Sequence, residues 1–215
     1  MGVVPFYGAS EPDLFAIERR AMDRPQRVVA ALDAALPDGL LLDVGAGSGH
    51  TAIRLTSPTR TVVALEPAAG MIDREIPVPW VRGDAETLGV TTDGVDAVYA
   101  TWAYFFSRNF DPRPGLREAW RVVRPGGVIA VVDNLGGDEF CALAATDISA
   151  DPAYWERLGF TLTVVETVFD FDELDEARRL LGRFFGDPGA AVDHTTLGFR
   201  VGLWTREVTA GGPPV

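Results

Sequence analysis

Residues 40–50 read Leu-Leu-Leu-Asp-Val-Gly-Ala-Gly-Ser-Gly-His, and this stretch decides the fold. The apolar run that starts at Leu40 has the length and continuity of a strand buried on both faces of a parallel sheet. Small residues follow it: Gly45, Ala46, Gly47, Ser48 and Gly49. Glycine accepts positive φ and lets a ligand lie against the main chain, and Ser48 is expected to cap the next helix. A strand, a glycine turn and a helix N-terminus predict a nucleotide-binding site.

The spacing of the glycines separates two kinds of nucleotide site. A dinucleotide site takes Gly-x-Gly-x-x-Gly, and this chain has His50 where the last glycine or alanine would stand. The pattern here, Gly-x-Gly-x-Gly preceded by Asp43, resembles motif I of the class I S-adenosylmethionine (SAM) dependent methyltransferases, in their small-molecule, type 11-like branch. The resemblance implies that SAM is the cofactor and that Asp43 and the glycine turn contact it.

Length and composition suit one domain with a sizeable core, since the chain has 215 residues and 47% of them are hydrophobic. We expect an N-terminal helical segment over residues 1–36 that packs on the core, a SAM-binding domain over residues 37–210, and a loose tail over residues 211–215. Alternating strands and helices predict an α/β fold with a parallel sheet covered on both faces. The resemblance implies one Rossmann-like, doubly wound sheet in the order 3-2-1-4-5-7-6, with strand 7 antiparallel.

Composition also excludes several classes of protein. A formal net charge of −12 argues against binding to nucleic acid or to an anionic membrane surface. Every basic residue is an arginine, which excludes a Schiff-base or Walker-type lysine. The N-terminus does not read as a signal peptide and no apolar run approaches the roughly 20 residues of a membrane span, so a cytoplasmic location is expected. The single cysteine, Cys141, is predicted to be a buried small hydrophobe.

Two acidic residues follow predicted strands at positions where a nucleotide could meet them. Glu66 ends the apolar run that starts at Thr61, about 20 residues after the glycines, where α/β nucleotide sites place a carboxylate for the ribose hydroxyls. Asp84 lies in a Gly-Asp-Ala-Glu segment that resembles the family motif whose Asp accepts a hydrogen bond from the adenine amino group. The alternatives are a solvated glutamate and an Asx turn. The resemblance extends cofactor contacts to four further residues: Pro67, Met71, Ala85 and Thr101.

An aromatic segment follows the strand predicted over residues 95–100, at the sheet edge where ligands bind in such folds. It predicts an apolar or aromatic wall for the methyl acceptor, although core packing is an equal alternative for Trp102. The other acceptor candidates are Tyr104 and Phe105 from the same segment, Tyr7 near the N-terminus, and Asp133 after the fifth strand. The Asn/Asp-Pro-Pro-Tyr sequence of nucleic-acid and protein amide methylases is absent, which argues against their chemistry.

The second half of the chain carries the remaining expected elements. Residues 117–133 resemble the most regular segment of the family, in which a helix and an Arg-Pro-Gly-Gly turn lead into the fifth strand. A further helix, interrupted at Pro152, is expected within residues 138–158. Strands over residues 161–171 and 195–208 are predicted to pair as an antiparallel hairpin. The amphipathic helix between them, residues 173–185, reads as packing or as a lid.

Methyl transfer from a sulfonium is an in-line displacement, so the protein need only align the nucleophile and exclude water unless the acceptor arrives protonated. His50 beside the glycine turn reads as packing near the methionine end of the cofactor, and His194 reads as an exposed loop residue. The catalytic residues stay unassigned. Two histidines and one cysteine suggest no metal site.

Three hypotheses follow from the sequence. The first is a SAM-dependent methyltransferase acting on a small molecule, as a monomer or homodimer. The second is a degenerate SAM-binding domain that serves as a partner or scaffold. The third is an NAD-linked oxidoreductase, disfavoured by His50 and by the missing lysine of a Tyr-x-x-x-Lys set. Identity of the acceptor atom, whether oxygen, nitrogen or carbon, is not encoded in any recognised motif.

Overall fold

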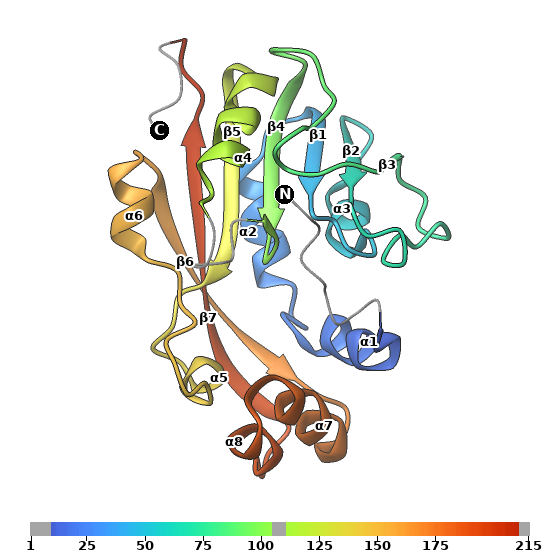
Figure 1. The fold of residues 1–215 in the computed structure, drawn as a ribbon, viewed down its shortest axis with the longest axis vertical. Coiled ribbons are helices and arrows are strands. Elements are labelled where there is room, and N and C mark those ends of the chain that lie inside the picture. Colours follow the sequence, from blue (N-terminus) through green and yellow to red (C-terminus); the bar gives the residue numbers. More distant parts are fainter. Residues whose placement is uncertain (1–9, 105–110, 211–215) are drawn as a thin grey trace.

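The computed structural model describes residues 10–104 and 111–210, and these form one mixed sheet with helices on both faces (Figure 1). The strands are β1 (Gly39–Val44), β2 (Arg60–Leu65), β3 (Trp80–Val81), β4 (Val95–Thr101), β5 (Val123–Asn134), β6 (Thr161–Asp170) and β7 (Thr196–Glu207). Their order in the sheet is β3-β2-β1-β4-β5-β7-β6. The first five strands pair in parallel, and β7 is antiparallel to both β5 and β6. The predicted strand order is confirmed.

Helices cover the two faces because each carries an apolar stripe. They are α1 (Pro12–Ala21), α2 (Arg27–Ala35), α3 (His50–Leu55), α4 (Arg113–Val122), α5 (Glu139–Ala142), α6 (Pro152–Arg157), α7 (Leu174–Phe185) and α8 (Asp187–Ala190). Leu32 of α2 and Leu55 of α3 are buried in the core of one face. Trp120 of α4 and Trp155 of α6 are buried in the core of the other. Ile17 of α1 belongs to the first core, so the N-terminal helices pack on the sheet.

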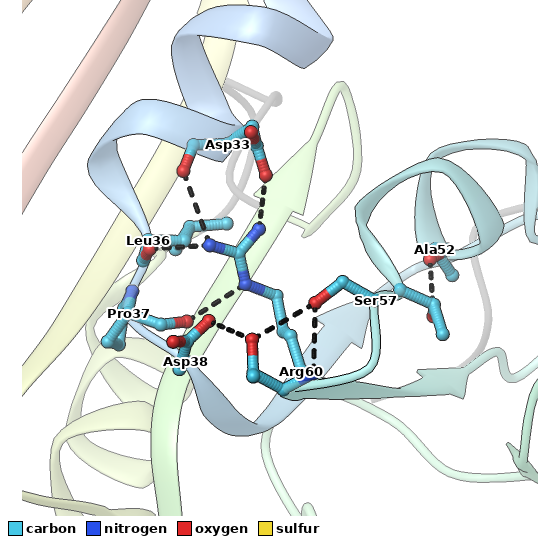
Figure 2. Close-up of polar contacts among 9 residues, drawn as sticks. Asp33, Leu36, Pro37, Asp38, Ala52, Ser57 and Arg60 are labelled. Atoms are coloured by element: carbon cyan, nitrogen blue, oxygen red, sulfur yellow. Dashed lines mark hydrogen bonds and ion pairs between the residues drawn. The ribbon is translucent and has the colours of Figure 1, made fainter.

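A buried arginine fixes the N-terminal end of β2 against α2 (Figure 2). Arg60 is 7% exposed, and its guanidinium pairs with Asp33 Oδ1 at 2.5 Å. It also donates to the carbonyl oxygens of Leu36 at 2.8 Å and Pro37 at 2.9 Å. These carbonyls belong to the end of α2, where backbone acceptors have no partner within the helix. The contact therefore joins α2 to β2 at the end of the sheet that lies opposite to the carboxyl ends of the parallel strands.

The β6–β7 hairpin extends past the rest of the sheet. β7 pairs with β5 only from Val201 onward, whereas its pairing with β6 continues back to Thr196. The overhanging part lies beyond Asn134, the carboxyl end of β5. Helices α7 and α8 connect the two strands at the end of this overhang (Figure 1). The hairpin thus carries two helices to the end of the sheet where the parallel strands terminate.

One local prediction is wrong. Ser48 does not cap α3, because that helix begins at His50 and has Gly49 at its N-cap with φ 80°. The helix expected within residues 138–158 forms as two short helices, α5 and α6: α6 begins at Pro152, where the interruption was predicted, and the two helices have acidic N-caps, Asp138 and Asp151. Over the described residues, no helix combines the length and apolarity needed to cross a membrane.

Candidate functional site

A cavity of about 1010 Å³ opens at the carboxyl ends of the parallel strands. Its wall includes the glycine turn after β1, Glu66 after β2, Trp102 after β4 and Asn134 at the end of β5. Helices α1, α2 and α7 close other sides of it. The loops after neighbouring parallel strands meet at this edge, which is where α/β sheets bind their ligands. The sequence-predicted turn and strand ends are therefore brought together in one space.

Glycine is required in the turn for two reasons. Gly45, at φ 75°, approaches the segment after β4 so closely that a Cβ would lie 2.5 Å from the Ala103 Cβ. Gly47, at φ 56°, faces the cavity, and a Cβ there would lie 3.7 Å from the Phe15 ring and 3.8 Å from the Met71 methyl. Positive φ is strained for residues with a side chain. Helix α1, through Phe15, therefore lies across the turn.

Glu66 is 6% exposed and holds the turn in place. Its Oε2 accepts a hydrogen bond from the Gly47 amide at 2.9 Å, and its Oε1 accepts one from the Ala68 amide at 2.8 Å. Burial raises the pKa of the carboxyl, and the two amide donors oppose that rise. Each oxygen keeps a further acceptor position, so the carboxylate can receive two hydroxyl donors from the cavity.

Asp84 lies at the cavity wall and forms the Asx turn that was the alternative prediction. Its Oδ1 accepts a hydrogen bond from the Glu86 amide at 2.9 Å, and the residue is exposed. The turn aims the carboxylate without consuming both oxygens. The other predicted cofactor residues at the wall surround these two acids: Ala46, Ser48, Pro67, Met71, Ala85 and Thr101. The Ser48 hydroxyl is buried without a hydrogen-bond partner.

Two predicted cofactor residues do not line the cavity. Gly49 packs outward, where an added Cβ would lie 2.8 Å from the Trp80 ring. Asp43 is fully buried and stands beside Tyr99 in the β1–β4 register, beneath the turn. Desolvation raises the pKa of the Asp43 carboxyl to about 7, opposed by the Tyr99 hydroxyl and reinforced by the negative charge of Glu66. Asp43 thus contributes charge or a proton from below the turn.

The segment after β4 crosses the cavity floor. Trp102 adopts φ 46°, and its Nε1 donates a hydrogen bond to Asn134 Oδ1 at 3.1 Å. Its ring stacks on Phe199 with centroids 6.0 Å apart. The Tyr104 hydroxyl donates to Glu86 Oε1 at 3.0 Å, and burial raises the pKa of that phenol. Both predicted aromatic residues therefore line the cavity in fixed orientations.

Sequence reasoning missed an aromatic group at the far end of the cavity. Its members come from α5, the β6–β7 overhang and α7: Phe140, Phe169, Phe184, Phe185 and Phe199. Phe140 stacks on Phe169 with ring centroids 4.3 Å apart. The centroid of the Phe140 ring also lies 4.9 Å from that of Phe199 and 5.1 Å from that of Phe185. We call this group, together with Trp102, the aromatic chamber. Only the length of the overhang brings these rings together, and no sequence motif reports it.

Other candidates lie elsewhere. Asp133 is buried but is absent from the cavity wall, where the alternation of β5 places Asn134 instead. Tyr7 and Phe105 lie outside the described residues. His194 is exposed, 2.7 Å from both Asp193 and Glu139, and its pKa is raised first by Asp193.

Two further side chains bear on chemistry. Cys141 is half-buried, and desolvation raises the pKa of its thiol to about 12, so it is a poor nucleophile at neutral pH. His50 lines the cavity, and burial followed by the charges of Arg54 and Arg19 lowers its pKa to about 4. It is neutral at pH 7. In the described ranges, no group of three His, Cys, Asp or Glu side chains is arranged to hold a metal ion.

Comparison with known sequences agrees with this geometry. Residues 42–131 match the family model described as a methyltransferase domain. An uncharacterized methyltransferase of Mycobacterium tuberculosis is 34% identical over 117 residues, which cover 52% of this chain and 47% of that protein. A malonyl-[acyl-carrier protein] O-methyltransferase of Dechloromonas aromatica is 36% identical over 121 residues, 54% of this chain and 45% of that protein. The chain thus spans about half the length of the curated relatives it matches.

A solved structure extends the similarity to most of the chain. The YcgJ protein of Bacillus subtilis aligns over 85% of this chain and 98% of its own, with a TM-score of 0.59 and 18% sequence identity. At that identity the likeness concerns the fold alone. It includes the region after residue 131, which the family model does not cover.

Proposed function

We propose that this chain is a class I SAM-dependent methyltransferase and that it transfers a methyl group from SAM to a small-molecule acceptor, a proposal supported by the methyltransferase-domain match and the methyltransferase relatives. One observation carries the proposal. The cavity runs without interruption from Asp84 and Glu66, past the glycine turn, to the aromatic chamber. Polar acceptors at one end suit a nucleoside, and apolar rings at the other end suit a different molecule.

The residues present fit SAM. The Glu66 carboxylate has two acceptor positions for the ribose hydroxyls, and Asp84 has an oxygen for the adenine amino group. The amino-acid end would then lie along the glycine turn, because β1 is the next strand after β2 in the sheet. A side chain at Gly47 would project into that space. Asp43 lies below the turn, and a nearby cation would favour the ionised form of its carboxyl, whose pKa burial raises.

When bound, SAM supplies a methyl group that is already activated by its sulfonium. The chain would then orient the acceptor and exclude water. Trp102 and Asn134 hold the floor between the two ends of the cavity, and their hydrogen bond fixes both side chains. No described residue is assigned as a general base, since His50 is neutral but its Nδ1 already receives Arg19.

The acceptor is inferred from the aromatic chamber. The family match ends at residue 131, so every phenylalanine of the chamber lies outside it. We therefore do not transfer the malonyl-carrier substrate of the Dechloromonas relative to this chain. Rings stacked at 4.3–6.0 Å favour a flat or apolar body on the acceptor. Tyr104 and the amide of Asn134 provide the polar contacts at its near end.

The first test is calorimetric titration of the purified chain with SAM, S-adenosylhomocysteine (SAH) and NAD. We expect micromolar binding of SAM and SAH and none of NAD, followed by methyl transfer in a screen of apolar acceptors. Binding of NAD alone would overturn the proposal in favour of an oxidoreductase. Binding of SAM without transfer to any acceptor class would favour the scaffold hypothesis.

A further inference from the structure

Arg19 occupies the cavity wall beside the glycine turn. It lies on α1 one helical turn after Phe15, whose ring covers Gly47. The guanidinium carbon is 5.8 Å from the centroid of the Phe15 ring, and Nη2 donates to His50 Nδ1 at 3.4 Å. Phe15, His50 and Arg19 all line the cavity. The charge of Arg19 is therefore placed at the amino-acid end of the proposed cofactor site.

Arg19 has no anionic partner among the described residues. Its Nε is buried and donates to no acceptor among these residues. Its Nη2 donates a hydrogen bond to His50, whose imidazole is neutral. The adjacent Arg20 is different, since it pairs with Asp172 at 2.7 Å and with Glu176 at 2.6 Å. The chain has 31 acidic residues for 19 arginines, so acids are abundant. An arginine left without one at a cavity wall is a position for an external anion.

The surroundings of Arg19 increase its need for an anion. Burial is the largest effect and lowers the pKa of its guanidinium; the negative charge of Asp73 opposes this, and the charge of Arg54, a smaller effect, lowers the pKa again. Arginine nevertheless remains charged at any ordinary pH. The two cavity acids that bear on the nucleoside form no ion pair with it, because Glu66 is held by backbone amides and Asp84 by its own turn.

We propose that Arg19 binds the α-carboxylate at the amino-acid end of SAM, and that α1 thereby supplies the part of the cofactor site that recognises this carboxylate. The inference rests on the proposed function. With the ribose at Glu66 and the adenine at Asp84, the amino-acid end would lie at the glycine turn. Arg19 lines the cavity beside this turn. Its planar guanidinium fork matches the geometry of a carboxylate. A carboxylate on the acceptor is the other source of the same chemistry.

The experiment compares two ligands that differ at this end. SAH carries the α-carboxylate, and 5′-methylthioadenosine retains the nucleoside and sulfur but lacks the amino-acid group. Calorimetry measures both on the wild-type chain, on R19M, on R19K and on the control R54M. Arg54 is a suitable control because its positive charge is close enough to affect the pKa of Arg19, yet it does not line the cavity. Among the described residues, its guanidinium donates a hydrogen bond to the His50 carbonyl oxygen.

We expect R19M to weaken SAH binding roughly tenfold to a hundredfold, the size of a charge-assisted hydrogen bond, with 5′-methylthioadenosine changed less than about twofold. R19K should recover part of the loss, and R54M should leave the ratio of the two affinities unchanged. Equal weakening of both ligands by R19M would assign Arg19 a structural role and overturn the inference. Unchanged binding of both would also overturn it, and selective loss of turnover with carboxylate acceptors would then move the carboxylate to the acceptor. A wild-type chain that binds neither ligand would instead overturn the proposed function and this inference together.

Discussion

Trp102 and Asn134 join the ends of β4 and β5 across the cavity floor, through a hydrogen bond of 3.1 Å from the indole Nε1 to the side-chain Oδ1. Trp102 adopts φ 46°, which is unfavourable for a bulky residue, so the surrounding contacts hold it there. Its ring also stacks on Phe199 of the hairpin overhang. One side chain therefore connects the floor, the neighbouring strand and the aromatic chamber.

Trp102→Phe keeps a ring but removes the donor. We expect a loss of about 1–2 kcal/mol in the free energy of unfolding, because the Asn134 oxygen loses its partner. SAH affinity should stay within about twofold, since the indole faces the acceptor end. Urea unfolding and calorimetry measure the two quantities. A large loss of SAH affinity with unchanged stability would place Trp102 in the cofactor site.

Glu66→Gln and Asp84→Asn test the nucleoside end. Each replacement leaves the shape of the side chain and removes a charged acceptor, so SAM binding should weaken by about 1–3 kcal/mol in each variant. The same loss is expected for 5′-methylthioadenosine, in contrast to R19M. If both variants bind SAM as the parent does, the cofactor assignment is wrong.

Asp43→Asn tests the buried carboxyl below the turn. Its pKa of about 7 lies above its unfolded value, so the folded chain holds this proton more tightly and wild-type stability falls as pH rises toward 7. The variant lacks this titration. We expect its stability relative to wild type to improve by about 2–3 kcal/mol between pH 5 and pH 8. Parallel pH profiles of the two chains, measured by urea unfolding, would contradict the raised pKa.

Phe185→Ala opens the aromatic chamber from α7. The residue is half-buried and contacts Phe140 at 5.1 Å, so the stability cost should stay near about 1–2 kcal/mol, below the range for a fully buried phenylalanine. SAH affinity should not change. For an acceptor found by screening, kcat/KM should fall about tenfold or more. The matched control is Phe160→Leu, which alters a buried ring on the other face of the sheet.

Arg60→Met tests the anchor at the opposite end of the sheet. The Arg60 guanidinium donates to the carbonyl oxygens of Leu36 at 2.8 Å and Pro37 at 2.9 Å, and both would lose their donor. We therefore expect the free energy of unfolding to fall by about 2–4 kcal/mol. SAH binding by the folded variant should be unaffected. A fall in affinity at full folding would couple this anchor to the cavity.

Much of the fold was predictable because its signals are local. The apolar runs before Asp43 and Glu66 gave strands of the expected type, and the hairpin expected over residues 161–171 and 195–208 forms as β6 and β7. Element ends were less predictable. Helix caps depend on backbone angles, and Gly49 rather than Ser48 takes the left-handed position that starts α3.

The sequence by itself determined the strand–helix alternation, the glycine turn and the acids that follow β2 and β3, because each depends on residues close together in the chain. The strand order was implied by the family resemblance, since local patterns do not fix which strands pair. Tertiary structure alone decided three things. It set how far β7 runs past Asn134, and so where the aromatic chamber forms. It placed Asn134 rather than Asp133 at the cavity. It placed Arg19 beside the turn with its Nε buried and without a hydrogen-bond partner among the described residues. Each depends on the register and packing of segments distant in sequence, which periodicity cannot specify.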